Sequence, residues 1–207
     1  MTVGLRERQK LERRQRIEAA ARAVFREKGY DGATTREIAS RAEVSIGTLF
    51  AYAADKRELL TMVYRDELHA LTESTFAAVP AAAPLLDQLI HVLEPRFVYW
   101  NTDPELARHA VRETFAATYP APGATNAAPP PEQFLHTQLV ALIAASRGVG
   151  RIAGNDDPGL IARVVLDIYL SENRAWLAQP QPVLAEGVAR LRAALELALR
   201  ALIGSGG

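Results

Sequence analysis

The 207-residue sequence contains no cysteine, which excludes disulfide bridges, thiolate metal sites and a cysteine nucleophile. It also lacks any run of about 18 apolar residues, so no membrane-spanning helix is expected. The stretch RERQKLERRQRIE near the N-terminus is charged throughout and has no apolar core of the kind that signal peptides carry. From these absences we expect a soluble protein of the cytoplasm with no membrane partner.

Apolar residues make up 49% of the chain, enough for a sizeable core, and the formal net charge is zero. The charge is unevenly divided, however. Residues 1–60 carry 13 Lys or Arg against 9 Asp or Glu, and residues 61–207 carry 11 against 15. A basic N-terminal third on an acidic body is typical of a chain whose one end meets a polyanion, although mixed charges on a solvated helix give the same counts.

The spacing of apolar residues predicts an all-α fold of about nine helices, since they recur every three or four positions and rarely alternate. The expected helices cover residues 11–28, 35–42, 46–52, 56–79, 84–101, 104–119, 132–147, 158–179 and 182–203. Gly29 is placed to end the first helix. The Pro- and Gly-rich residues 120–131 indicate an exposed connector, and the final GSGG a loose tail.

Three capping signals define the short helices near the N-terminus. Thr34 is followed three residues later by Glu37, and Asp55 by Glu58, which is the spacing of a capping box. Ser45 is placed to cap the helix that starts at Ile46. Two such short helices are not stable by length alone, so flanking helices must hold them. The predicted contacts come from five residues: Phe25, Ile38, Val44, Leu49 and Leu59.

Two short helices joined by a tight turn make a helix-turn-helix, whose second helix lies in the major groove of DNA. The helix at 46–52 has one buried anchor, Leu49, which leaves its other side for DNA. The fragments AAARAVFREKGYDGATTREIA, AEVSIGTLF and DKRELL occur in the order and spacing of a known domain. Residues 17–60 resemble the DNA-binding domain of the tetracycline-repressor (TetR) family of bacterial transcriptional regulators.

The resemblance implies a homodimeric, all-helical regulator, with a DNA-binding domain at 1–55 and a ligand-binding and dimerisation domain at 56–207. It implies a small-molecule effector that releases the protein from a palindromic operator, no cofactor, and repression as the commoner direction. The chain departs from the family at four positions. Glu43 stands where Gly is usual in the turn, Phe50 where Tyr is common, Tyr52 where His is common and Ala53 where a buried Phe is common.

The place of each residue in the predicted helices suggests its role in DNA binding. Free amides and the positive dipole end at the start of the second helix favour a phosphate, and Lys56 resembles a family lysine that contacts the DNA backbone. Residues at the start of the third helix are placed to enter the groove, and capping or packing is the less favoured alternative for any single one of them. The predicted DNA-binding residues are Thr34, Thr35, Arg36, Ser45, Ile46, Gly47, Thr48, Phe50, Tyr52 and Lys56.

The arm that precedes the first helix contains Arg6, Arg8, Lys10, Arg13, Arg14 and Arg16. It either reaches a phosphate or minor groove, or is a solvated, frayed terminus.

Aromatic residues concentrate in the middle of the chain, where an apolar pocket with a few polar groups suits a small molecule. The same residues at helical spacing also serve as ordinary core. The predicted effector site, for an aromatic, uncharged or weakly acidic ligand, comprises Phe97, Trp100, His109, Arg112, Phe115, Tyr119 and Phe134.

The last two helices are the predicted dimer contacts. An apolar stripe at Leu184, Val188, Leu191, Leu195 and Leu202 accompanies the small residues Ala185, Ala189 and Ala193. With the preceding helix they make half of a four-helix bundle. The competing interpretation is that this stripe faces only the core of one chain.

Two other functions are weighed against the regulator. Glu105, His109 and Glu113 share one helix face, but a metal enzyme needs ligands from partner helices, and no such motif, nucleophile elbow or phosphate loop occurs. We therefore expect no enzyme activity and no metal. A DNA-binding module without a ligand remains the second alternative, which a thermal-shift screen distinguishes.

Overall fold

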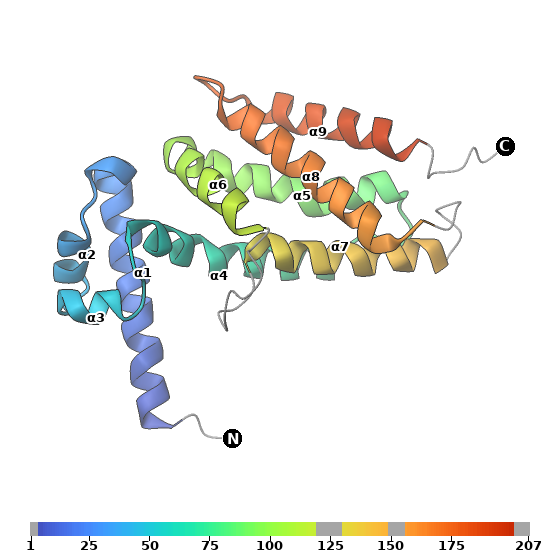
Figure 1. Ribbon diagram of the computed structural model, residues 1–207. Coiled ribbons are helices and arrows are strands. Elements are labelled where there is room, and N and C mark those ends of the chain that lie inside the picture. Colours follow the sequence, from blue (N-terminus) through green and yellow to red (C-terminus); the bar gives the residue numbers. More distant parts are fainter. Residues whose placement is uncertain (1–3, 119–129, 149–155, 201–207) are drawn as a thin grey trace. The chain divides into compact units, whose positions relative to one another are not determined.

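The computed structural model describes residues 4–118, 130–148 and 156–200, with the side chains of 113–118 excepted. Within these ranges the chain forms nine α-helices and no strand (Figure 1). Their bounds are α1 Leu5–Gly32, α2 Thr35–Arg41, α3 Ile46–Phe50, α4 Lys56–Ala77, α5 Leu85–Asn101, α6 Pro104–Thr118, α7 Pro131–Gly148, α8 Pro158–Leu177 and α9 Leu184–Leu199. The predicted all-α class is confirmed.

The chain divides into two compact units, Met1–Glu67 (unit 1) and Leu68–Gly207 (unit 2). The division falls inside α4, whose first half is hydrogen-bonded to α1 through Lys56 and Asp66 and whose second half lies in unit 2. The predicted domain boundary at 55/56 lies at the start of the same helix and stays a functional prediction.

Unit 1 is built on one buried stripe of α1. Ile17, Ala20, Ala21, Val24 and Phe25 are all buried, as their spacing predicts. The regular helix is interrupted at Gly29, whose φ of +68° suits glycine because a side chain would be strained there. A last turn then reaches Gly32, and α1 begins six residues earlier than expected, at Leu5.

In the helix-turn-helix, α2 packs against α1 and α3 packs against α2. Ile38, Leu49 and Leu59 are buried, whereas Val44 is half-buried. An ion pair adds to this packing, because Arg41 donates from both terminal nitrogens to Glu27 at 2.6 and 2.8 Å and so ties α2 to α1. The buried face of α3 is therefore limited to Leu49.

Unit 2 is a helical bundle in which α8 packs against α6, α7 and α9, and α9 also packs against α5 (Figure 1). Gly187 permits the close approach of α9. A Cβ built there would lie 2.7 Å from Trp176 Cδ1 and 3.1 Å from Phe97 Cε1. Leu191 and Leu195 are buried within the same chain, so that part of the predicted stripe faces the intramolecular core. Leu202, Tyr119 and most of the predicted connector lie outside the described residues.

None of the helices in the described ranges combines the length and apolarity that crossing a bilayer requires.

Candidate functional site

The exposed side of α3 is set by its cap and its single anchor. Ser45 accepts a hydrogen bond from Thr48 N at 3.0 Å, and the two hydroxyl groups lie 2.8 Å apart. Leu49 turns into the core, which leaves Ile46 42% exposed and Phe50 46% exposed. Exposed large apolar side chains on a helix one and a half turns long are a cost in water unless a partner covers them.

The start of α2 forms half of the predicted capping box. Thr34 accepts from Glu37 N at 3.2 Å, but the Glu37 carboxylate pairs with Lys28 Nζ at 2.8 Å. The carboxylate therefore ties α2 to α1, and Arg36 projects into solvent. The first turn of α2 keeps free amides for an anion, as the phosphate prediction for Thr34, Thr35 and Arg36 requires.

Glu43 occupies the turn between α2 and α3 with φ of +54° and is the only residue other than glycine with positive φ in the described chain. The predicted strain at this departure from the family is thus present. The Glu43 carboxylate stands 3.8 Å from Arg16 of α1 in an exposed ion pair.

Tyr52 and Lys56 are engaged inside unit 1. The Tyr52 hydroxyl donates to Lys10 O at 3.4 Å. Lys56 Nζ donates to Tyr30 O at 2.8 Å, Ala33 O at 3.2 Å and Asp31 O at 3.3 Å, and it lies 4.6 Å from the centre of the Tyr30 ring. These carbonyls end α1, so Lys56 neutralises their dipoles. Sequence reasoning missed this role, and the phosphate contact of Lys56 stays a prediction.

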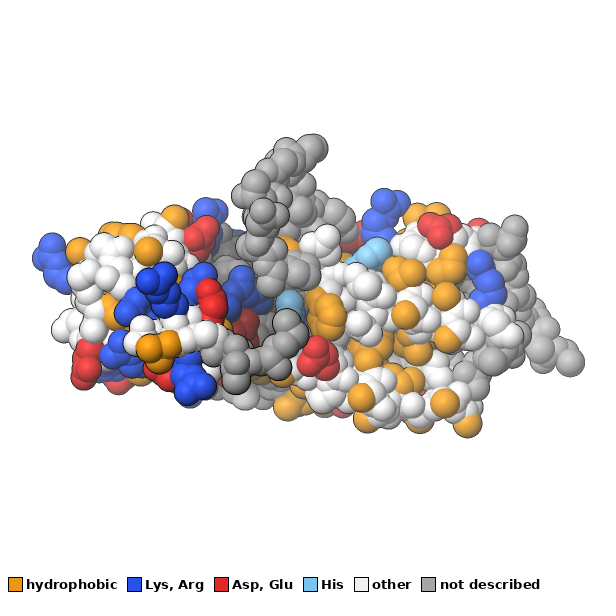
Figure 2. All heavy atoms as spheres, turned by 90° about the horizontal axis from the view of Figure 1, so that it is seen from below, with side chains coloured by type: hydrophobic (Ala, Val, Ile, Leu, Met, Phe, Trp, Pro, Cys, Tyr) orange, Lys and Arg blue, Asp and Glu red, His pale blue; other side chains and the backbone are white. Residues whose placement is uncertain are grey.

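Lys and Arg side chains gather around a small apolar group on the face of unit 1 that Figure 2 shows at its left. The excess of four positive charges over residues 1–60 is consistent with this concentration. An electropositive face with a protruding short helix suits DNA, because phosphate contacts position a protein and base contacts supply sequence preference. No structural observation tests the individual contacts, which stay predictions.

In unit 2 the structure brings together two of the predicted effector residues. Phe97 and Trp100 are both buried around Tyr169, whose ring centre lies 5.9 Å from that of Phe97, and Trp100 Nε1 donates to the Tyr169 hydroxyl at 3.3 Å. Phe134 is half-buried and packs on His69, at 4.8 Å between ring centres. His109 is half-buried, Arg112 is exposed, and Phe115 and Tyr119 lie outside the described side chains.

A buried polar network in unit 2 was missed by the sequence reasoning. Arg96 is 1% exposed, and its three guanidinium nitrogens donate to the Tyr169 hydroxyl at 3.1 Å, to the Thr72 hydroxyl at 3.1 Å and to Glu132 Oε1 at 3.2 Å. The network joins α4, α5, α7 and α8. A signal was present, because Leu89, Leu93, Arg96 and Trp100 form one helical stripe in which only the third member is charged.

Two opposing effects act on the pKa of Glu132, the carboxylate of this network. Burial raises the pKa of Glu132 above its ordinary value, and the Arg96 charge opposes that rise. The second carboxylate oxygen, Oε2, is buried and accepts no hydrogen bond within the described chain. An ion pair of this kind is costly to break, since either partner alone is a buried, uncompensated charge.

A metal centre is not supported by the described side chains, which contain no group of three His, Asp or Glu arranged to hold an ion. Glu113, one of the three residues on the face considered above, falls outside them.

Comparison with known proteins agrees with the fold. Residues 17–63 match the sequence profile described as "Bacterial regulatory proteins, tetR family". The chain is 28% identical to the HTH-type transcriptional repressor KstR of Mycobacterium tuberculosis over 193 residues, which cover 93% of this chain and 81% of the relative. It is 29% identical to KstR of Rhodococcus jostii over 197 residues, covering 94% and 84%.

Among solved structures, FadR of Thermus thermophilus, a TetR-family repressor in complex with lauroyl-CoA, has the same fold with a TM-score of 0.70. It is 24% identical and covers 94% of this chain and 99% of its own. FadR of Bacillus subtilis in complex with stearoyl-CoA is 19% identical with a TM-score of 0.61, covering 87% and 97%. The profile match falls on the helix-turn-helix, and the relatives extend through both units. Residues 17–63 are therefore a DNA-binding domain of the TetR family of bacterial transcriptional regulators, and the relatives that match nearly the whole chain are transcriptional repressors and not enzymes.

Proposed function

We propose that the protein is a ligand-responsive repressor that binds a palindromic operator as a homodimer in the cytoplasm and is released by a small molecule. The observation that carries the proposal is the exposed side of α3, where Ile46 and Phe50 stand out from a capped helix anchored only by Leu49. On a basic face, this short helix fits the major groove, which is about 12 Å wide.

The place of each residue in α2 or α3 suggests whether it contacts a phosphate or a base. The first turn of α2, with Thr34, Thr35 and Arg36, holds a phosphate and fixes the register. The start of α3 reads bases, with Gly47 allowing close approach and Thr48 facing a thymine methyl or a base edge. Phe50 adds an apolar contact in place of the hydroxyl that its relatives often carry.

A homodimer is supported by an exposed apolar surface on the last two helices. Leu160 and Val164 of α8 are 45% and 44% exposed, one turn apart. On α9, which packs against α8, Ala185, Ala189 and Ala193 are exposed at intervals of four residues. Small residues let a second pair of helices approach closely. The proposed dimer carries two α3 helices, which in the usual helix-turn-helix geometry enter successive major grooves about 34–36 Å apart.

The effector is proposed to bind in unit 2, where Phe97 and Trp100 meet Tyr169 beside the buried Arg96. Two structural relatives were solved with acyl-CoA thioesters bound. These thioesters are therefore the first probes, together with weakly acidic aromatic compounds. A coupling free energy of roughly 1–3 kcal/mol between the effector and DNA sites is enough for a useful switch.

Selection of bound duplexes from a random library by the purified protein tests the DNA proposal. Enrichment of an inverted repeat with half-sites about one helical turn apart supports it. If the folded protein enriches no motif, the proposed operator binding is wrong. Adding lauroyl-CoA to the protein bound to its selected duplex then tests release, and a thermal shift that grows with ligand concentration tests binding independently of DNA.

Two matched variants test the roles on unit 1. Thr48→Ala is expected to change the preferred base at one position of each half-site, because it removes a group at a base edge. Arg36→Gln is expected to weaken binding to all duplexes alike and to flatten the salt dependence by about 0.9 per phosphate lost. If Thr48→Ala leaves the selected motif unchanged, Thr48 serves only the Ser45 cap.

A further inference from the structure

The N-terminal half of α1 carries a stripe of residues at alternating intervals of four and three: Arg6, Lys10, Arg13, Ile17, Ala20 and Val24. The last three are buried against the rest of unit 1, whereas the first three are exposed. The side of α1 that faces the unit 1 core thus changes from apolar to basic where the helix runs beyond that core. We call residues 5–16 the basic arm.

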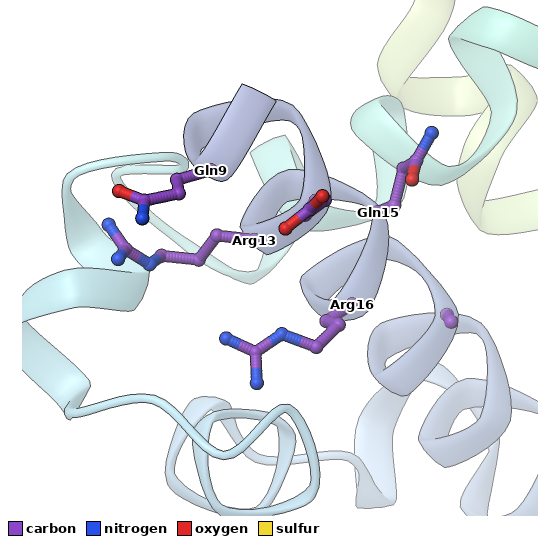
Figure 3. A pocket seen from close by; sticks show the side chains of 6 residues that line it. Gln9, Arg13, Gln15 and Arg16 are labelled. Atoms are coloured by element: carbon purple, nitrogen blue, oxygen red, sulfur yellow. The ribbon is translucent and has the colours of Figure 1, made fainter. Parts of the chain in front are cut away.

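The basic arm stands beside the helix-turn-helix. The Tyr52 hydroxyl, two residues after α3, donates to Lys10 O, and Arg16 lies 3.8 Å from Glu43 in the turn. A shallow hollow follows the arm and is lined by Gln9, Glu12, Arg13, Gln15, Arg16 and Ala19. Figure 3 shows Gln9, Arg13 and Arg16 projecting from the same side of α1 into this hollow, whereas Gln15 points away.

The charge on this stripe has no counterpart in the described chain. Residues 5–16 contain six Lys or Arg against two Glu. Arg14 pairs with Glu18 and Asp66, but Arg6, Lys10 and Arg13 have no ion pair among the described residues. Like charges three or four residues apart destabilise an isolated helix, so a partner with negative charge stabilises this one.

We propose that the basic arm is a second DNA-contacting element, which binds the phosphodiester backbone beside the groove that α3 enters. The inference rests on the proposed function, because it requires α3 to lie in the major groove. Phosphates border that groove on both sides, and Tyr52 and Glu43 place Lys10 and Arg13 next to the turn and the end of α3. The arm contacts phosphate and not bases, so it adds affinity without changing sequence preference.

Tyr52 has a corresponding role as a positioning residue. Its half-buried ring and its hydrogen bond to Lys10 O hold the arm against the end of α3. At this position the family often has His, whose side chain is shorter and has no hydroxyl group to donate to Lys10 O.

The test compares two double variants of the full-length protein with the same change of charge. Lys10→Gln/Arg13→Gln removes the charge on the arm stripe. Arg26→Gln/Arg200→Gln removes the same charge from exposed positions outside the arm. Each is titrated with a duplex that carries the selected site plus ten flanking base pairs per side, and with one cut at the outer edges of the site, at several salt concentrations.

On the long duplex, the arm variant is expected to bind on the order of 30-fold more weakly per protomer at 0.15 M salt, because two phosphate contacts are lost. Its salt slope should fall by about 1.8 per protomer, 0.9 for each of two phosphates. The selected motif should stay the same, and the control variant should keep the wild-type slope. Tyr52→Phe should produce part of the loss on the long duplex.

Equal slopes for the arm and control variants would overturn the inference and show the arm to be a solvated terminus. An arm variant that selects a different motif would also overturn it, in favour of base reading. If the wild-type protein selects no operator, the proposed function fails separately, and the slope comparison still decides about the arm on any duplex.

Discussion

The two units both use side-chain hydrogen bonds to fix helices, but they place them differently. In unit 1 the Ser45 cap and the Lys28–Glu37 pair lie at the surface. In unit 2 the Arg96–Glu132 pair and its neighbours are buried. Surface bonds shape a helix end at small cost and leave the polar atoms accessible to DNA. Buried bonds make the packing of four helices depend on one another, as a unit that responds to a ligand requires.

The largest expected effect is at Arg96. Arg96→Met leaves Glu132 as a buried charge without a partner, so the free energy of unfolding of unit 2 should fall by about 3–5 kcal/mol. The only two tryptophans of the chain, Trp100 and Trp176, are buried in unit 2. Their fluorescence during urea denaturation therefore measures unit 2 alone.

The control for Arg96 is the exposed pair of Arg192 with Asp87 at 2.9 Å, where Arg192→Met should cost at most about 1 kcal/mol. The double variant Arg96→Met/Glu132→Leu should recover much of the loss, because it removes both charges. If the double variant is as unstable as Arg96→Met, lost packing and not an unpaired charge is the cause.

A second large effect is expected at Gly187. In Gly187→Ala the new Cβ meets the rings of Trp176 and Phe97 at 2.7 and 3.1 Å, and overpacking of this kind costs about 1–3 kcal/mol. The same substitution in unit 1, Gly47→Ala, places a Cβ only near Ser45 Oγ at 4.0 Å. It should leave the stability of the free protein equal or slightly higher.

Tryptophan fluorescence reports the first Gly→Ala variant and circular dichroism the second. Similar melting temperatures for Gly187→Ala and the wild type would mean that α9 shifts to admit the methyl group.

The contrast between the units also explains what sequence reasoning found. The caps of unit 1 join residues three apart, as with Thr34 and Glu37, so their spacing is visible in the sequence. Arg96 instead bonds partners 24, 36 and 73 residues away. Periodicity and caps located the nine helices of the described ranges, but the sequence reasoning did not single out Arg96. Periodicity contains no information about which distant residues complete the network.

Lys56 differs from both the caps and Arg96. Its DNA-binding role was predicted from the family resemblance, whereas the structure shows it bound to carbonyl groups within unit 1. The three carbonyls it contacts lie more than 20 residues away in sequence. Its predicted phosphate contact came from the family, and the internal role came from the packing of α4 against the end of α1. Neither role follows from local spacing.

Lys56→Met therefore separates the two roles. Loss of the internal bonds should lower the stability of unit 1 by about 1 kcal/mol and speed amide exchange in the last turn of α1. Loss of a phosphate contact should flatten the salt dependence of DNA binding by about 0.9 per protomer. A variant with altered stability but an unchanged salt slope would assign Lys56 to the fold of unit 1 alone.

The smallest effect is expected at Glu43, where strain and charge are combined in one residue. Glu43→Gly relieves a φ of +54° and should raise the stability of unit 1 by roughly 0.5–1 kcal/mol, after the greater freedom of glycine in the unfolded chain is included. Glu43→Ala keeps the Cβ and removes only the carboxylate. Thermal unfolding of both variants thus isolates the strain, and equal stability of the two would mean that the turn relaxes around the side chain.

Glu43→Gly and Glu43→Ala together also measure the effect of the carboxylate charge on DNA binding. Both variants remove a carboxylate that stands beside Arg16 on the side of unit 1 proposed to bind DNA, so both should bind every duplex more tightly and by a similar factor. Binding that improves only in Glu43→Gly would instead trace to the shape of the turn, since the two variants share their charge. If both variants behave as expected, Glu43 lowers the stability of unit 1 through its backbone strain and weakens the proposed DNA binding through its charge.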